Sequence, residues 1–459
     1  MPVLKAFFLP HPPLAVPDVG EGREEGIKET IESFRRVASE IAAIEPETII
    51  IMTPHGMVYS DYFHISPGEK ASGSFAVFGA PEAVVSVCYD SVLTERISKT
   101  AAQYGIGAGT MGEKDSKLDH GTMVPLWFVN EKQTVYKVVR ISQSAMEPAA
   151  HYRMGQAISE AVRDTRTVFI ASGDLSHKLA ENGPYGLSHE GILFDEIMVK
   201  IFNNGDYLSL LGIEAGFREK AAECGYNSLV TVAGIYDGFS VKSSLLSYEN
   251  TFGVGYAAAV IEPIKKDAAR DILKQFDKSE EVKIALMRQN EDAYQALARR
   301  SLEYTVQNGG TLPVPDLLPP EMHNTRAGTF VSIHKYGRLR GCVGTILPTA
   351  KNIAQEIIKN AVSAGLHDNR FEPVAEHELP FLSYKVDVLA EPEMISDESF
   401  LDVKRYGVIV SSGKNRGLLL PNLDGIDTVE QQIDIAKQKA GIPYDTNVKL
   451  ERFEVVRHE

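Results

Sequence analysis

The chain has 459 residues, and at roughly 100 to 200 residues per domain this length indicates two or three domains. Hydrophobic residues make up 44% and charged residues 24% of the sequence, which argues against disorder, collagen-like repeats and coiled-coil rods. The 62 Asp and Glu residues outnumber the 47 Lys and Arg residues and give a formal net charge of −15, so nucleic acid and anionic membranes are unfavourable partners.

The three cysteines, Cys88, Cys224 and Cys342, lie far apart and form no C-x-x-C pair. This spacing excludes a disulfide framework and a structural zinc finger. The apolar run at the N-terminus is interrupted by prolines and does not resemble a targeting segment. The cysteine pattern fits a reducing cytoplasm best. Because no stretch reaches the roughly 18 apolar residues of a membrane span, we expect a soluble protein.

The first third of the chain alternates strand-like and helix-like patterns. Residues 3–9 form a short apolar run, and residues 27–41 carry apolar side chains three or four positions apart, as an amphipathic helix does. Residues 48–52 form a continuous β-branched run, typical of a strand that is covered on both faces, and residues 135–141 and 167–171 are similar. The alternation predicts an α/β sandwich with a parallel or mixed central sheet over residues 1–262.

Charged residues dominate from residue 263, and we interpret residues 263–284 as a linker, although a charged helix fits this stretch equally well. A helical pattern follows and ends at the Gly309-Gly310 pair. Strand patterns at residues 329–334 and 408–410 and a helical pattern at residues 353–364 then predict a second domain over residues 285–459.

The positions of four histidines indicate a functional site. His11, His55 and His177 each follow a predicted buried strand, and open α/β sheets bind ligands at the carboxyl ends of their strands. His120 follows Asp119, a carboxylate that could orient an imidazole through its second nitrogen. A single histidine in a turn is more often structural, but four in this context favour a shared site.

Two imidazoles and one carboxylate on one side of an ion form the facial triad of non-haem Fe(II), which leaves positions for a substrate and dioxygen. Glu223, which precedes the turn at Gly225, is our candidate for the carboxylate; without the histidines it would be interpreted as a solvated acid at a helix end. The neighbouring Cys224 is an alternative ligand, because a thiolate selects softer ions such as Zn(II) or copper, or iron without dioxygen chemistry.

Residues 1–262 resemble the class III extradiol ring-cleavage dioxygenases, of the protocatechuate 4,5-dioxygenase β-subunit type, and their relative Memo. The resemblance lies in five segments that occur in the expected order: Pro10-His11-Pro12-Pro13, Pro54-His55-Gly56, Asp119-His120-Gly121 with Pro125-Leu126, Gly173-Asp174-Leu175-Ser176-His177, and Glu223-Cys224-Gly225.

The resemblance implies that His11, His55 and Glu223 bind iron, that His177 is the acid/base, and that His120 lines the pocket for dioxygen and substrate. The substrate would be a small aromatic diol or a related molecule. The Memo branch uses a cysteine in place of the glutamate, so the choice between Glu223 and Cys224 stays open, and with it ring cleavage itself.

From about residue 285 the chain resembles the AMMECR family. The segments that carry this resemblance are Leu339-Arg340-Gly341-Cys342-Val343-Gly344-Thr345, Asp368-Asn369-Arg370-Phe371-Glu372-Pro373, Gly417-Leu418-Leu419-Leu420-Pro421 and Lys439-Ala440-Gly441-Ile442-Pro443. It implies an α+β domain of undefined role that is sometimes joined to a Memo-like protein and a radical S-adenosylmethionine enzyme, in a system called AmmeMemoRadiSam. A radical enzyme of this kind is therefore a candidate partner.

The second domain offers a further candidate site at Arg340, Cys342, Asp368 and Arg370. Arg340 could bind a carboxylate or phosphate, and Cys342 could be a nucleophile if its thiolate were favoured. The alternative is that Cys342 is a small buried apolar side chain. Asp368 and Arg370 could form an ion pair that shapes a pocket or only holds a loop.

Two main hypotheses follow from the sequence. The first is a non-haem Fe(II) oxidoreductase of the extradiol dioxygenase type, fused to an AMMECR-like domain. The second is a Memo-like metal-binding module without ring cleavage, which acts as an adaptor or in a modification system with a radical enzyme. Zinc-dependent hydrolysis by the same ligands ranks last, and the sequence does not predict an oligomeric state.

Overall fold

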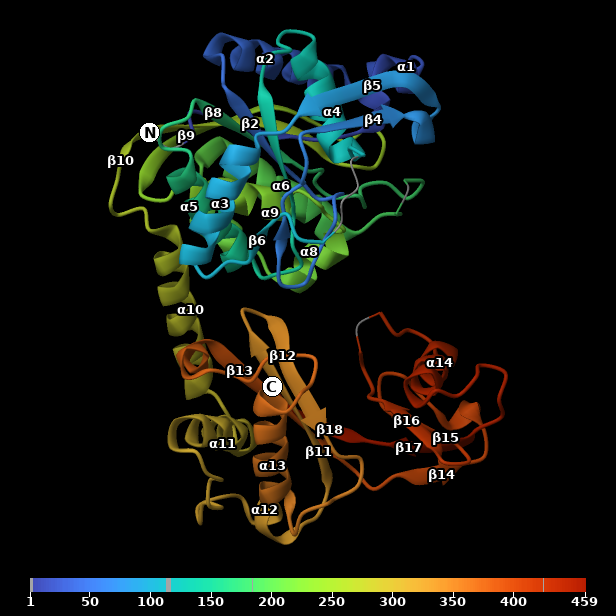
Figure 1. The fold of residues 1–459 in the computed structure, drawn as a ribbon. Coiled ribbons are helices and arrows are strands. Elements are labelled where there is room, and N and C mark those ends of the chain that lie inside the picture. The colour runs from blue at the N-terminus through green and yellow to red at the C-terminus, as the bar shows by residue number, and fades with distance from the viewer. Residues whose placement is uncertain (1–2, 113–116, 184, 424) are drawn as a thin grey trace. The chain divides into compact units, whose positions relative to one another are not determined.

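In a computed structural model of the protein, the chain folds into two compact units, Met1–Asp277 and Lys278–Glu459 (Figure 1). The structure describes residues 3–112, 117–183, 185–423 and 425–459. Within these ranges, none of the helices has the length and apolar character needed to cross a membrane.

The first unit is built on a six-stranded sheet with the strand order β7-β2-β8-β1-β10-β9. The strands β7, β2, β8 and β1 are parallel to one another, whereas β10 and β9 are antiparallel additions at the β1 side. The predicted mixed α/β sheet is confirmed. The strands are β1 (Ala6–Leu9), β2 (Thr48–Thr53), β7 (Lys137–Ser142), β8 (Thr167–Ser172), β9 (Phe239–Glu249) and β10 (Tyr256–Lys266).

The apolar composition of the central strands explains their position. Every residue of β1, β2 and β8 is buried, as expected for β-branched runs that are covered by helices on both faces. The helices of this unit are α1 (Pro17–Gly20), α2 (Lys28–Ile44), α3 (Ser91–Gln103), α4 (His120–Asn130), α5 (Pro148–Ala161), α6 (His189–Asn204), α7 (Tyr207–Leu211), α8 (Ala215–Ala221) and α9 (Tyr226–Ile235).

Two small sheets accompany the central one. The strands β4 (Lys70–Phe75) and β5 (Ala80–Cys88) form an antiparallel hairpin, and β3 (Phe63–His64) pairs with β6 (Ala108–Gly109). The segment that we expected to be a linker contains the end of β10 and the greater part of helix α10 (Ile272–Gln289), and the boundary between the two units falls inside this helix.

The second unit contains two antiparallel four-stranded sheets with helices packed against them, which is an α+β arrangement. Its helices are α11 (Ala293–Asn308), α12 (Pro320–Asn324), α13 (Ile353–Leu366) and α14 (Val429–Ala440). The first sheet has the order β12-β11-β13-β18, with β11 (Gly328–Lys335), β12 (Arg338–Gly344), β13 (Leu382–Leu389) and β18 (Val455–His458). The second has the order β14-β17-β15-β16, with β14 (Glu393–Ile395), β15 (Gly407–Ser412), β16 (Asn415–Leu419) and β17 (Lys449–Phe453).

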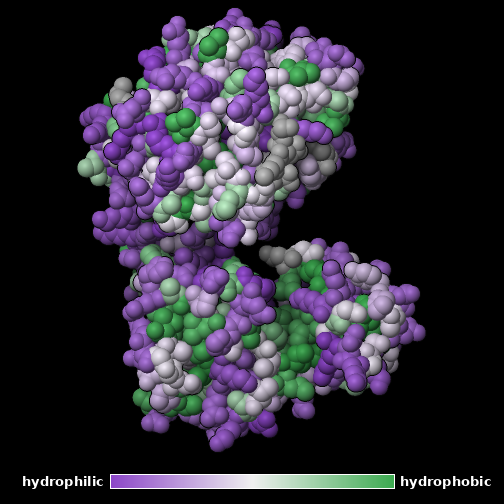
Figure 2. Space-filling model, viewed as in Figure 1, coloured by the Kyte–Doolittle hydropathy of each residue, from purple (hydrophilic) through white to green (hydrophobic). Residues whose placement is uncertain are grey.

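An apolar cluster joins the two sheets of the second unit. Its buried members are Leu389 from β13, Ile409 from β15 and Phe453 from β17, with Phe330 and Leu418 packed against them. Figure 2 shows apolar surface where these two sheets meet.

Candidate metal centre

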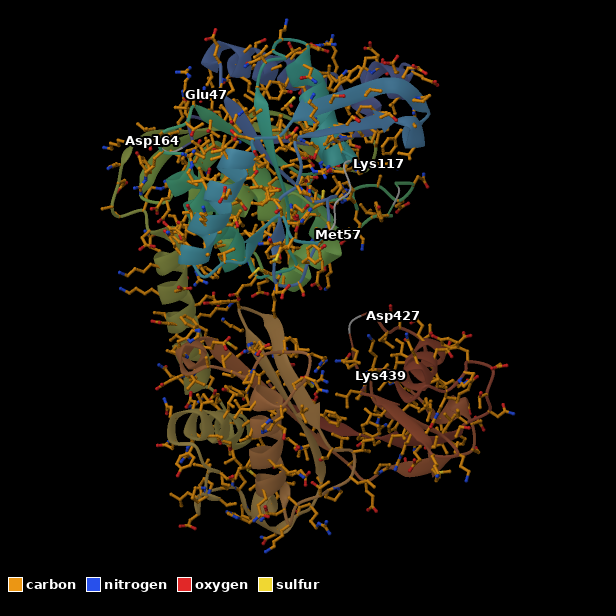
Figure 3. The ribbon with its side chains drawn as sticks, viewed as in Figure 1. Glu47, Met57, Lys117, Asp164, Asp427 and Lys439 are labelled. Carbon is orange, nitrogen blue, oxygen red and sulfur yellow. The ribbon has the colours of Figure 1, made fainter. Side chains whose placement is uncertain are left out.

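The candidate residues of the first unit gather at the carboxyl ends of three neighbouring parallel strands, because His11 follows β1, His55 follows β2 and His177 follows β8. Glu47 and Asp164 precede β2 and β8 and mark the amino ends of these strands, whereas Met57 lies beyond the carboxyl end of β2. In Figure 3, Glu47 and Asp164 lie on one side of the unit, and Met57 lies on the opposite side. This edge of the sheet is where the sequence predicted a ligand site.

Three imidazoles meet at this edge. The Nε2 atoms of His11 and His55 are 2.9 Å apart, and the His120 ring centroid lies 5.2 Å from that of His11 and 4.2 Å from that of His55. One nitrogen atom from each of the three rings lies within 4.8 Å of the others. The structure therefore brings His11, His55 and His120 into one cluster.

A sulfur and a carboxylate form a second group of donors, which shares His11 with the three imidazoles. Cys224 Sγ lies 3.7 Å and Asp174 Oδ2 lies 3.6 Å from His11 Nε2. The donor atoms of His11, Asp174 and Cys224 all lie within 4.8 Å of one another. Sequence reasoning did not select Asp174 as a site residue, although its position directly after β8 and three residues before His177 was a usable signal.

Glu223, the carboxylate chosen from the sequence, does not join this cluster. Its Oε2 accepts a hydrogen bond from the Tyr226 backbone N–H at 2.7 Å, and its Oε1 lies 3.5 Å from Arg218 Nη1. Arg218 in turn stacks on the Tyr226 ring at 3.9 Å. Burial raises the pKa of Glu223, and the neighbouring Arg218 opposes this shift. The carboxylate therefore stabilises the start of α9, and the alternative donor Cys224 faces the imidazoles.

His177 lies beside the cluster. Its Nδ1 contacts the carbonyl oxygen of Ala222, and its Nε2 is 3.9 Å from Asp174 Oδ2. Ala222 has a φ angle of 53°, in the left-handed region that is unusual for a residue other than glycine, and this conformation turns its carbonyl group toward the imidazole. The ring of Tyr185 meets the His177 ring edge-on, with centroids 5.4 Å apart.

Among the described residues, the hydrogen bonds of Asp119 go to Thr53 and Thr122. Its carboxylate accepts hydrogen bonds from Thr53 Oγ1 at 2.6 Å and from the Thr122 backbone N–H at 3.0 Å. The second bond makes Asp119 the N-cap of α4, whose first residue is His120. Asp119 therefore positions the helix that carries this histidine.

The charge state of the cluster suits a metal ion. Burial lowers the pKa of His11 well below its usual value, and burial together with His11 and His120 lowers the pKa of His55 to about 3. Both imidazoles are therefore neutral at pH 7 and have a nitrogen lone pair to offer. Burial raises the pKa of the Cys224 thiol, and nearby Asp174 adds to this effect. A bound cation would reverse this by favouring the thiolate, so the donor set fits a divalent metal.

Two glycines allow the loops that carry Asp174 and Cys224 to touch. A Cβ atom on Gly173 would lie 2.1 Å from the Cα atom of Gly225, so neither loop has room for a side chain at this point. The Asp174 N–H donates to Cys224 Sγ at 3.2 Å, and the N–H groups of Cys224 and Gly225 donate to the Asp174 carbonyl at 3.3 and 3.0 Å. This backbone contact places the thiol next to the carboxylate.

In the second unit, Arg340 is committed to a carboxylate. Its Nε and Nη2 donate to Glu378 at 3.1 and 2.9 Å, and Lys335 Nζ donates to the same group at 3.1 Å. Burial tends to raise the pKa of the Glu378 carboxyl group. Hydrogen bonds from Arg340 and from the Ala375 N–H, together with the charge of Lys335, outweigh this effect and hold the pKa at about 2. Glu378 therefore occupies the Nε and Nη2 edge of the guanidinium group, whereas Arg340 Nη1 is buried without a hydrogen-bond partner among the described residues.

The other three residues of this candidate site meet at the edge strand β12. Asp368 Oδ2 accepts the backbone N–H of Cys342 at 2.9 Å, and Arg370 Nη2 donates to the Cys342 carbonyl at 3.1 Å. Asp368 and Arg370 are themselves joined by bonds of 2.9 and 2.7 Å. The ion pair therefore satisfies both backbone groups of Cys342 on the side of β12 that has no neighbouring strand.

Comparison with known proteins identifies both parts of the chain. Residues 5–259 match the family described as the catalytic LigB subunit of aromatic ring-opening dioxygenase. The chain belongs to the LigB family. Residues 295–458 match the AMMECR1 family, so the protein is a fusion of a LigB domain and an AMMECR1 domain. Both family resemblances predicted from the sequence are confirmed.

The chain is similar to several proteins and solved structures. A protein of Clostridium acetobutylicum is 41% identical over 99% of this chain and 98% of its own length. A protein of Thermotoga maritima is 48% identical over 37% of this chain and 98% of its own length. A solved structure from Pyrococcus horikoshii matches 36% of this chain and 88% of its own chain, at 31% identity and a TM-score of 0.34. A solved structure from Escherichia coli matches 56% of this chain and 99% of its own chain, at 16% identity and a TM-score of 0.40.

Proposed function

We propose that the LigB domain is an oxidoreductase that holds one non-haem Fe(II) ion through His11 and His55, with the Asp174 carboxylate and Cys224 as further donors beside His11. The observation that carries this proposal is the position of His11 Nε2, which lies 2.9 Å from His55 Nε2 and 3.7 Å from Cys224 Sγ at the carboxyl ends of parallel strands. Membership of a family of ring-opening dioxygenase subunits supports iron and a small aromatic substrate. Asp174 Oδ2 is near enough to the same nitrogen to be a further oxygen donor.

The bound ion would supply the redox chemistry, because non-haem Fe(II) with open positions can hold a substrate and dioxygen together. The protein supplies the orientation of both. The ring of Phe78 meets the His120 ring edge-on at 5.5 Å, and Tyr185 meets His177 in the same way, so each of these two histidines has an aromatic side chain against it. A small aromatic diol would find apolar contacts there.

His177 would move the proton. A backbone carbonyl can only accept a hydrogen bond, so the contact with Ala222 requires a hydrogen on His177 Nδ1. The lone pair then resides on Nε2, which is on the side of Asp174. An imidazole in this state can take a proton from a substrate hydroxyl at Nε2 and return it later in the reaction.

A second candidate function is favoured by the sulfur donor. Extradiol chemistry uses two histidines and a carboxylate, whereas a thiolate favours softer ions such as Zn(II) or copper. The domain would then be a metal-binding module without ring cleavage. It would act with the AMMECR1 domain as an adaptor, or with a radical S-adenosylmethionine enzyme as a partner in a modification system.

Metal content and oxygen uptake distinguish these functions. The full chain is purified without oxygen, its bound metal is quantified, and dioxygen is added with a panel of catechols. Oxygen uptake with a ring-fission product, both lost in His177→Ala at unchanged metal content, supports the oxidoreductase. Stoichiometric metal without oxygen uptake supports the metal-binding module, and a protein that takes up none of Fe(II), Zn(II) and copper refutes both.

Two adjacent variants test the third ligand. Cys224→Ala should lose metal at concentrations that saturate the wild type, whereas Glu223→Gln should keep it, because the Glu223 carboxylate faces Arg218. With Co(II) as a probe, only the wild type and Glu223→Gln should show sulfur-to-metal charge-transfer absorption. If Glu223→Gln loses metal and Cys224→Ala keeps it, then Glu223 is the ligand, as predicted from the sequence.

A further inference from the structure

We propose that Ser172 is a positioning residue of the metal centre, which sets the tautomer of His11. The inference rests on the proposed metal centre and adds to it a residue outside the ligand set. Ser172 is the last residue of β8, is fully buried, and is paired in register with Leu9 of β1. It therefore lies beside the segment of chain that carries His11.

The hydroxyl group of Ser172 has two partners. Its Oγ atom lies 2.6 Å from the carbonyl oxygen of Gly121 and 2.9 Å from His11 Nδ1. A serine hydroxyl has one hydrogen, and a carbonyl oxygen can only accept. The hydrogen must therefore point to Gly121, and the hydroxyl oxygen must accept a hydrogen from His11 Nδ1.

Helix α4, which begins at His120, leaves the Gly121 carbonyl without its usual hydrogen-bond donor from the helix backbone. In α4 this carbonyl would ordinarily accept the backbone N–H four residues later, but position 125 is a proline and has no N–H. The Ser172 hydroxyl supplies a hydrogen bond that the helix cannot make. Pro125 thus has a structural reason to lie inside α4, and it directs the single hydrogen of Ser172 away from His11.

The consequence for His11 is a single tautomer. With its hydrogen on Nδ1, the neutral ring carries its lone pair on Nε2. This atom is the one that faces His55 Nε2 at 2.9 Å and Cys224 Sγ at 3.7 Å. Without Ser172 the hydrogen could move to Nε2, where Asp174 Oδ2 at 3.6 Å would favour it, and the ring would no longer offer a lone pair to the cluster.

The expected effect is on metal affinity. Partners of a ligating histidine typically change metal affinity by about 10- to 100-fold when they are removed. Ser172→Ala should weaken Zn(II) binding by such a factor in a competition titration with a chromophoric chelator, and Ser172→Thr, which keeps the hydroxyl, should restore most of it. Ser33→Ala is the matched control. Ser33 is a buried serine of α2 whose hydroxyl donates one hydrogen bond to Ser247, and it contacts none of the proposed metal ligands.

A measurement on the metal-free wild type keeps the inference testable even if Ser172→Ala folds poorly. Nitrogen-15 spectra of histidine-labelled protein, with His11 assigned from the spectrum of His11→Gln, should show a protonated Nδ1 and an unprotonated Nε2. The opposite tautomer would overturn the inference, as would Ser172→Ala with wild-type Zn(II) affinity. If the wild type binds neither Zn(II) nor Fe(II), the proposed function fails, and the tautomer still decides the role of Ser172.

Discussion

The contact between the Asp174 and Cys224 loops yields a sharp prediction for Gly173→Ala. The new Cβ atom would lie 2.1 Å from Gly225 Cα and 2.9 Å from Gly225 N, whereas ordinary van der Waals contacts begin at 3.4 Å. The obstacle is backbone and cannot rotate away. The two loops must therefore separate by more than 1 Å at this point.

Separation costs stability and removes a ligand. Overpacking a close contact costs about 1–3 kcal/mol, and each weakened hydrogen bond between the loops adds about 0.5–1.5 kcal/mol, so we expect Gly173→Ala to lower the free energy of unfolding by about 2–5 kcal/mol. Because Cys224 Sγ accepts the Asp174 N–H across this contact, Zn(II) affinity should fall as well. Urea denaturation and chelator competition measure the two effects.

Gly216→Ala is the control for this substitution. Gly216 lies in the neighbouring helix α8 and has no atom within 4 Å of the position that a Cβ would take. Because Gly216 lies in the first turn of α8, alanine there should stabilise the protein by at most about 0.5–1 kcal/mol and leave Zn(II) affinity unchanged. If Gly173→Ala behaves like Gly216→Ala in both assays, the loop contact does not hold the centre together.

Three further predictions concern other charged groups. Burial raises the pKa of Asp195 to about 7, above its unfolded value near 4, so the protein loses stability as pH rises between these values. Asp195→Asn should therefore gain stability relative to wild type from pH 5 to pH 8. A difference in urea midpoint that stays constant over this range would contradict the prediction. The pKa of Glu378 is held at about 2, below its usual 4.5, so the carboxylate's contribution to folding stability is present above pH 4.5 and is lost as pH falls toward 2. The destabilisation caused by Glu378→Gln, measured by thermal unfolding, should therefore become smaller as pH falls through this range. Arg370→Ala leaves the buried Asp368 without its cation and should destabilise the AMMECR1 domain by about 1–3 kcal/mol in urea unfolding, and wild-type stability would show that the pair does not hold β12.

Much of the architecture was predictable because it is written in local patterns. The run of β-branched residues in β2 has no polar alternation, and this identifies a strand covered on both faces before any neighbour is known. The positions of His11, His55 and His177 directly after such strands were equally visible. Since parallel strands end at the same edge of a sheet, the convergence of these residues at one edge followed from chain order alone.

The sequence by itself therefore determined the two domains, the mixed sheet and the edge at which the candidate residues gather. Only the tertiary structure decided which atoms face one another there. Glu223 and Cys224 are neighbours in the chain, and the direction of each side chain depends on the turn between α8 and α9 and on the position of Arg218. Asp174 and Ser172 likewise acquire their partners from segments more than 50 residues away, through loop contacts that no local pattern encodes.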